Sequence, residues 1–209
     1  MKPIRYCLCL LALTALLSAC ASTPAPGNTL FLLQQEANTT ATQTQQAPAT
    51  TTILALTPVQ LAPYLTGEGI VYQTGANRIV IAGSNQWAAP LQSQLSDGLY
   101  QTLDQALANV DIRRPGLTPA GRDADFKLIV HVQQFQGRYD GSAVISGNWR
   151  LFDRDGEIAG RGAFDETTPL QEDGYAALVR ALSAGWAQAR QAMAQAIGKA
   201  LAGATRAGS

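Results

Sequence analysis

The segment between residues 125 and 167 most constrains the fold of this chain. It contains three β-rich runs, at residues 125–139, 142–152 and 157–167. The bends between them are Asp140-Gly141 and Asp155-Gly156, and Asp-Gly is a strong signal for a tight hairpin turn. Apolar residues occupy alternate positions of the first two runs, so each predicted strand has one apolar face. We therefore predict an antiparallel three-strand meander that is covered on one side.

Two segments have the periodicity of amphipathic helices. After Pro90, leucines recur every four residues at Leu91, Leu95, Leu99, Leu103 and Leu107. A second apolar stripe runs from about residue 173 to residue 201 and includes Tyr175, Leu178, Leu182, Trp186, Met193 and Ile197. Two helices on one face of a mainly antiparallel or mixed sheet make a two-layer α+β domain.

Shorter patterns precede the first helix. Residues 29–34 are expected to form a short buried strand and residues 53–57 another, and the Thr/Gln-rich tract at 37–52 between them is expected to be a disordered loop. Pro58 and Pro63 should keep the following segment extended. Residues 70–73 and 78–82 should pair as a hairpin, because the residues between them tolerate positive φ.

The N-terminus has the three-part layout of a secretory signal. Lys2 and Arg5 precede an apolar stretch, which ends in the small residues Ser18 and Ala19 before Cys20. The stretch is too short to cross a bilayer, which takes about 20 apolar residues. Leu17-Ser18-Ala19-Cys20 resembles the bacterial lipobox, so we predict cleavage before Cys20 and lipid attachment to it. Residues 1–19 would be removed, and residues 20–28 would form a flexible tether.

Composition restricts the mature domain further. Cys7 and Cys9 leave with the signal and Cys20 carries lipid, so no disulfide is expected. Loss of Lys2 and Arg5 leaves 13 basic residues against 15 acidic ones, a net charge of about −2, which does not favour nucleic acid. We expect a single domain over residues 29–203, followed by a flexible tail at 204–209.

No catalytic, metal or cofactor site is expected. The mature chain has one histidine, His131, which is predicted to lie in mid-strand on the less buried face. The segment Asp153-Arg154-Asp155-Gly156-Glu157 lacks the twelve-residue pattern of a calcium loop, so its carboxylates are interpreted as turn residues. The sequence contains none of the common nucleophile or phosphate-binding motifs.

One apolar segment is a candidate for contact with a partner or with lipid. Leu61, Tyr64 and Leu65 lie in a stretch that Pro58 and Pro63 stiffen. Trp87 is included in the same candidate region, although each tryptophan of the mature chain also suits a core between sheet and helices. The simpler alternative is that the three residues Leu61, Tyr64 and Leu65 pack beneath the Leu91–Leu107 helix.

The order of these landmarks resembles the PqiC-like ABC-type transport auxiliary lipoproteins. The most specific parts of the resemblance are Leu61–Leu65, Ile70–Tyr72, Asn77-Arg78 and Trp87–Leu91. It implies a non-enzymatic lipoprotein of the outer membrane that faces the periplasm and serves in lipid transport or envelope integrity. The partners it implies are an MCE-domain periplasmic protein and an inner-membrane transport subunit, and a homo-oligomer is left open. The alternative is an outer-membrane lipoprotein that activates a cell-wall synthase or helps to assemble a secretion pore.

Overall fold

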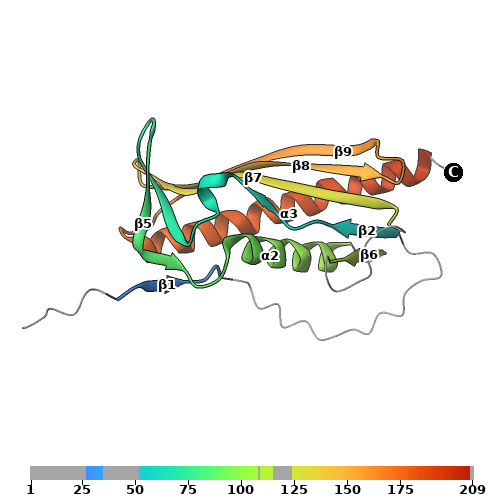
Figure 1. Cartoon of the computed structure of the whole chain (residues 1–209). Coiled ribbons are helices and arrows are strands. Elements are labelled where there is room, and N and C mark those ends of the chain that lie inside the picture. Colours follow the sequence, from blue (N-terminus) through green and yellow to red (C-terminus); the bar gives the residue numbers. More distant parts are fainter. Residues whose placement is uncertain (1–26, 35–51, 108, 115–123, 208–209) are drawn as a thin grey trace, which may run out of the picture.

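The computed structural model describes residues 27–34, 52–107, 109–114 and 124–207. The elements follow the chain as β1 (Thr29–Phe31), β2 (Thr52–Leu56), β3 (Gln60–Leu61), the 3₁₀ turn η2 (Pro63–Leu65), β4 (Gly69–Gly75), β5 (Arg78–Trp87), α2 (Leu91–Ala106), β6 (Val110–Arg113), β7 (Phe126–Arg138), β8 (Ser142–Asp153), β9 (Ile158–Pro169) and α3 (Tyr175–Ala207). Nine strands form one mixed sheet, and both helices lie against the same face of it (Figure 1). The predicted α+β class is confirmed.

Strand β7 is the centre of the sheet. Along one edge it pairs with β8 over its whole length, and β8 pairs with β9, so the predicted meander is confirmed. Along the other edge, β2, β3 and β4 follow one another, each parallel to β7. Strand β6 lies outside β2, and β5 and then β1 lie outside β4. This one long strand therefore holds both halves of the sheet in register.

The meander turns have the chemistry that the sequence predicts. Gly141 and Gly156 take positive φ values of 80° and 84°, which suits the residue without a Cβ. The predicted hairpin of β4 and β5 is confirmed, since the two strands pair antiparallel, although no described residue in its turn has positive φ. A register shift between Gln73 and Gly75 accompanies this chain reversal instead.

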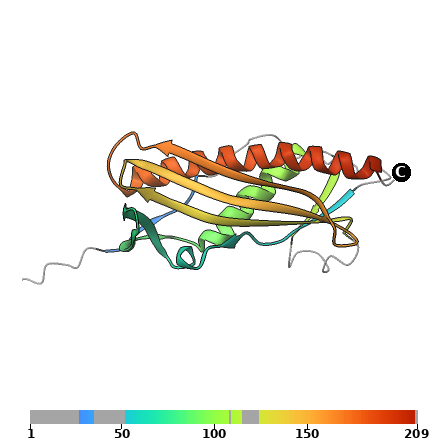
Figure 2. The ribbon, with the colours of Figure 1, turned by 90° about the horizontal axis from the view of Figure 1, so that it is seen from above.

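The core lies between the sheet and the two helices. The predicted inward residues of β7 and β8 are buried, and so are the leucines of α2 from Leu91 to Leu103. Trp87, Trp149 and Trp186 are buried as well, which confirms the interpretation of the tryptophans as core residues. Helix α3 lies along β8 and β9, with α2 packed beside it (Figures 1 and 2).

Several local expectations need correction. Strand β1 is an edge strand rather than a buried one, since among the described strands it pairs with β5 alone. Leu30 within it and Leu32 just after it are each 59% exposed. The segment after Pro58 is extended only as far as β3, and residues 63–65 then turn as η2. Strand β6 was not expected, and α3 continues four residues beyond the predicted domain end at residue 203. The predicted loop at 37–52 lies almost entirely outside the described residues.

Candidate partner-contact surface

Cys20, the predicted lipid attachment site, lies outside the described residues. Nine positions separate it from Thr29, the first residue of β1. An extended chain spans at most about 3.6 Å per residue, so the Cα atom of Cys20 can be no more than about 32 Å from that of Thr29. The end of the molecule that carries β1 is therefore within this reach of any membrane to which Cys20 is attached.

Two of the four predicted contact residues belong to the core. Leu65 is 2% exposed, and Trp87 is 6% exposed with its ring centroid 6.1 Å from that of Phe135. Leu65 is the buried residue of the turn η2. Leu61 and Tyr64 remain half-buried, so only these two can be reached from the surface.

Tyr64 supports a β-bulge in β7. Gln133 is the extra residue of this bulge, since Val132 pairs with Gly147 and Gln134 pairs with Ser146. The Tyr64 hydroxyl donates to the Gln133 carbonyl oxygen at 2.7 Å, and it lies 2.9 Å from Oε1 of Gln136. Burial raises the pKa of this hydroxyl, so it stays protonated as a donor. Its hydrogen bond to the unpaired bulge residue is a structural role.

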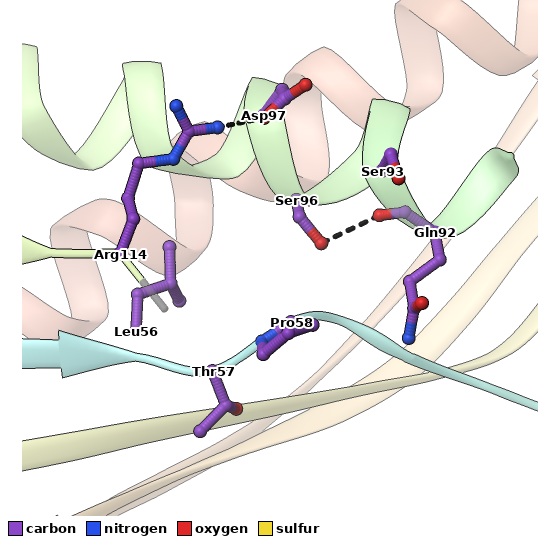
Figure 3. A pocket seen from close by; sticks show the side chains of 8 residues that line it. All are labelled: Leu56, Thr57, Pro58, Gln92, Ser93, Ser96, Asp97 and Arg114. Atoms are coloured by element: carbon purple, nitrogen blue, oxygen red, sulfur yellow. Dashed lines mark hydrogen bonds and ion pairs between the residues drawn. The ribbon is translucent and has the colours of Figure 1, made fainter. Parts of the chain in front are cut away.

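A groove of about 370 Å³ lies between α2 and the β2–β3 connection (Figure 3). Its walls are Leu56, Thr57, Pro58, Gln92, Ser93, Ser96, Asp97 and Arg114. Helix α2 presents polar side chains to the connection here, and Arg114 reaches across from the end of β6 to form an ion pair with Asp97 (Figure 3). The Arg114 guanidinium also lies 4.4 Å from the ring centroid of Tyr100.

The polar groups of this groove hold the proline segment to α2. Val59 lies between β2 and β3 and belongs to neither strand. Helix α2 supplies the hydrogen-bond partners of its backbone N–H and C=O groups. Its N–H donates to Ser96 Oγ at 3.0 Å, and its carbonyl accepts from Gln92 Nε2 at 2.9 Å. Ser96 in turn donates to the Gln92 carbonyl. These three hydrogen bonds tie the proline segment to α2, so the arrangement is that of a structural clamp.

The sequence analysis missed an exposed apolar surface on the β4–β5 hairpin. Ile79, Val80 and Ile81 are each 42–50% exposed although they are consecutive and thus point to alternate faces. The hairpin stands out from the body of the sheet at the end that carries β1 (Figure 1), so neither face is fully covered. We call these three residues the hairpin surface. The sequence shows three consecutive β-branched residues here, but only the protruding position of the hairpin reveals that these residues are exposed.

An exposed tyrosine, Tyr139, and an ion pair lie beside the β4–β5 hairpin. Tyr139, which is 58% exposed, follows the end of β7, where β4 pairs through Tyr72 and Gln73. Arg138 and Asp140 form an ion pair on either side of it. The hydrogen bond from Arg138, with a second from Ser142, lowers the pKa of Asp140 from 3.8 to about 2. This end of the molecule therefore combines apolar residues with charges that are already paired.

A family model described as the ABC-type transport auxiliary lipoprotein component matches residues 31–194. The chain belongs to this family. It is 36% identical over 148 residues to the intermembrane transport lipoprotein PqiC of Escherichia coli K12. The aligned region covers 69% of this chain and 74% of that protein. The protein of the same name from Shigella flexneri matches to the same extent. The resemblance identified from the sequence is confirmed, and this chain is an auxiliary lipoprotein of a transport system.

Two solved structures share the fold. A crystal structure of an uncharacterized protein is 33% identical, with a TM-score of 0.66, and the match covers 82% of this chain and 99% of that one. A protein from Xanthomonas campestris is 17% identical, with a TM-score of 0.63 over 83% of this chain and 94% of that one. The second likeness shows the fold alone.

The described residues show neither a metal-binding cluster nor a membrane-spanning helix. Within the described ranges, no group of three or more His, Cys, Asp or Glu residues could hold a metal ion. No helix in this part of the chain has both the length and the apolar character to cross a membrane.

Proposed function

We propose that this chain is the outer-membrane lipoprotein subunit of an MCE-type lipid transport and envelope-integrity system. It would be anchored through acylated Cys20, face the periplasm and act by contact rather than by catalysis. Membership of the transport auxiliary lipoprotein family supports the proposal. The partners would be an MCE-domain periplasmic protein and an inner-membrane transport subunit.

The observation that carries the contact role is the hairpin surface. Ile79, Val80 and Ile81 offer apolar side chains on both faces of a protruding hairpin. Exposed apolar groups of this kind mark interaction sites, because leaving them in water is unfavourable by about 25 cal/mol for each Å². The edge of β5 before Asn85 also has no strand paired to it among the described residues. A partner chain can therefore gain both apolar burial and backbone hydrogen bonds here.

The half-buried pair Leu61 and Tyr64 has a smaller part in this proposal. Both lie where β3 and η2 pass along β7, and a partner that covers the hairpin can extend to them. Leu65 and Trp87 support the surface from below, as core residues.

A pull-down of the full-length lipoprotein from detergent-solubilised envelopes tests the function. We expect wild type to recover the MCE-domain protein and Val80→Asp to lose it, because a carboxylate cannot be buried unpaired in an apolar contact. Thr167→Asp is the matched control, since it places the same acid at an exposed β-branched position of β9. It should recover the partner as wild type does.

The remaining outcomes decide against the proposal. Recovery of a peptidoglycan synthase or of a secretion pore by wild type, without the MCE-domain protein, would support the alternative function. Equal recovery by Val80→Asp and wild type would place the contact elsewhere on the molecule. A thermal melt of both variants shows whether each is folded.

A further inference from the structure

No described helix or strand covers the face of β7, β8 and β9 that points away from the helices, and Figure 2 looks onto it. Lys127, Arg150 and Arg161 project from it, one from each strand, and all three are exposed. Their neighbours on the strands, such as Leu128, Trp149 and Leu151, point the other way and are buried under the helices. We call Lys127, Arg150 and Arg161 the basic triad.

The register brings the basic triad together. Ile129, Arg150 and Arg161 form one row across the sheet, because Arg150 pairs with both of the others. Lys127 belongs to the adjacent row on the same face, with Phe152 and Ile158. Residues directly opposite each other in antiparallel strands have Cβ atoms about 4.5–5.5 Å apart, and two like charges in that position repel. The Arg150–Arg161 pair is thus an unfavourable arrangement for a folded sheet alone.

No ion pair in the described part of the chain neutralises this charge. None of its five ion pairs includes a member of the basic triad. Two carboxylates at this end of β7 and β8, those of Asp125 and Asp153, have other partners. Asp125 accepts from the Ile53 N–H and pairs with Arg154, and Asp153 accepts from two backbone N–H groups of its own turn. Three positive charges are therefore left to the solvent or to a ligand.

Apolar residues and a hollow lie beside the triad. Ile129 and Phe152 are half-buried and Ile158 is 50% exposed, all on the same face. A hollow of about 420 Å³ adjoins them. Its wall holds Ala55, Ala124, Phe126, Lys127, Ile129, Phe152, Asp153, Arg154 and Gly156, so it contains two cations and one carboxylate. This volume lies within the range of about 300–1,000 Å³ typical of small-molecule sites. Positive charge and apolar surface are thus side by side, the combination that an anionic amphiphile requires.

We propose that this open face binds a single anionic phospholipid, with its phosphate on the basic triad and its chains against Ile129, Phe152 and Ile158. Two guanidinium groups can each donate two parallel hydrogen bonds to phosphate oxygen atoms, and Lys127 adds a third cation. The phosphate would relieve the repulsion between Arg150 and Arg161. The choice of a lipid over other anions rests on the proposed transport function.

The test is a titration of the mature lipoprotein in non-ionic detergent, followed by native mass spectrometry and calorimetry. The probe is dihexanoyl phosphatidylglycerol below its micelle concentration, compared with dihexanoyl phosphatidylcholine. We expect the anionic lipid to bind more tightly, and Arg150→Gln/Arg161→Gln to weaken it by about tenfold or more. Arg78→Gln/Lys199→Gln removes the same charge from exposed positions elsewhere and should change the affinity less than twofold. Phe152→Gln should weaken the lipid but not inorganic phosphate.

Four results would overturn the inference. The first two are an unchanged affinity in the Arg150/Arg161 variant and equal binding of the two lipids. The third is inorganic phosphate that binds as tightly as the anionic lipid, which would indicate an adventitious ion only. The fourth is poly-glutamate that binds more tightly than the anionic lipid, which would indicate an acidic protein partner. Misfolding is not expected to obscure the result, because removing like charges should leave the melting temperature unchanged or higher. The titration needs no partner protein, so it can succeed or fail independently of the pull-down with Val80→Asp.

Discussion

At the scale of single residues, Asp140 shows how one carboxylate can fix a turn. It follows β7 in the bend before β8, and its Oδ2 accepts from Arg138 Nε at 2.8 Å. Its Oδ1 accepts from the Ser142 hydroxyl at 2.6 Å and from the Ser142 N–H at 3.2 Å. These bonds favour the ionised form, which is why the pKa of Asp140 falls to about 2.

This pKa predicts a pH dependence of stability. The folded pKa is lower than the ordinary value of 3.8, so the contribution of Asp140 is complete above pH 4 and is lost as pH falls toward 2. Asp140→Asn should therefore be less stable than wild type at neutral pH, and the gap should close between about pH 4 and pH 2. Chemical unfolding of both proteins across this range measures it. A gap that is independent of pH would show that the turn does not depend on the charge.

Tyr64 and Leu65 are adjacent residues with separable roles. Leu65→Ala should lower the free energy of unfolding by about 2–5 kcal/mol, because it leaves a cavity in the core. Tyr64→Phe keeps the ring but removes the donor to Gln133 at the bulge, which should cost about 1 kcal/mol. Denaturant titration distinguishes the two losses. If Leu65→Ala unfolds like wild type, Leu65 is not a core residue and its predicted contact role regains support.

At the scale of elements, the bulge in β7 depends on a glycine in the neighbouring strand. Gly147 pairs with Val132, and a Cβ at this position would lie 2.2 Å from the His131 carbonyl oxygen and 2.5 Å from Phe164 Cζ. The backbone of β7 and a buried aromatic ring therefore occupy the space that a side chain would need. This close approach allows the long strands β7 and β8 to stay paired on both sides of the bulge.

Gly147→Ala should consequently destabilise the protein by about 1–3 kcal/mol or more, since the ladder or the Phe164 ring must shift. Gly83→Ala is a suitable control, because it also lies in a strand and a Cβ there would have no neighbour within 4 Å. Thermal unfolding of the two variants should show a clear loss for the first and little change for the second. Similar melting temperatures would mean that the bulge can absorb the methyl group.

The elements that were predictable from sequence are those specified by neighbouring residues. The meander depends on two Asp-Gly turns and on alternation within each strand, and α2 depends on leucines four residues apart. Strands β2, β3 and β4 share one edge of β7, and these pairings join segments that are far apart in the sequence. Local sequence patterns therefore cannot predict them. The four-residue strand β6 carries too little periodicity to be recognised.

The candidate site was less predictable for the same reason. Leu61, Tyr64 and Leu65 were grouped by adjacency in the chain, but η2 turns Leu65 into the core. From the sequence, alternation within each strand indicates only that Lys127, Arg150 and Arg161 each point outward from their own strand. The two hairpin registers are needed to place Arg150 beside Arg161.

At the scale of the whole molecule, the arrangement separates three kinds of surface. The helices cover one face of the sheet, and the β4–β5 hairpin stands at the end with β1 (Figures 1 and 2). The basic triad lies on the opposite face of the sheet. The C-terminal end of α3 lies at the opposite end of the molecule (Figure 1). An anchor on Cys20 would thus bring the hairpin end toward the membrane and leave the length of the sheet available to ligands.

This arrangement functions only if Cys20 carries lipid, and that requirement is directly testable. Each methylene that enters the membrane adds about 0.8 kcal/mol of affinity, so several acyl chains hold a protein far more firmly than one. Cys20→Ala should accumulate as a full-length precursor or be mislocalised, because lipid attachment precedes cleavage of the signal. Cys9→Ala is the control: it alters a cysteine that leaves with the signal, so processing should be normal. Membrane fractionation, globomycin sensitivity and mass spectrometry of the N-terminus measure the outcome. A mature N-terminus other than acylated Cys20 would remove the basis for the proposed membrane anchorage, whereas the fold of residues 52–107 and 124–207 would be unaffected.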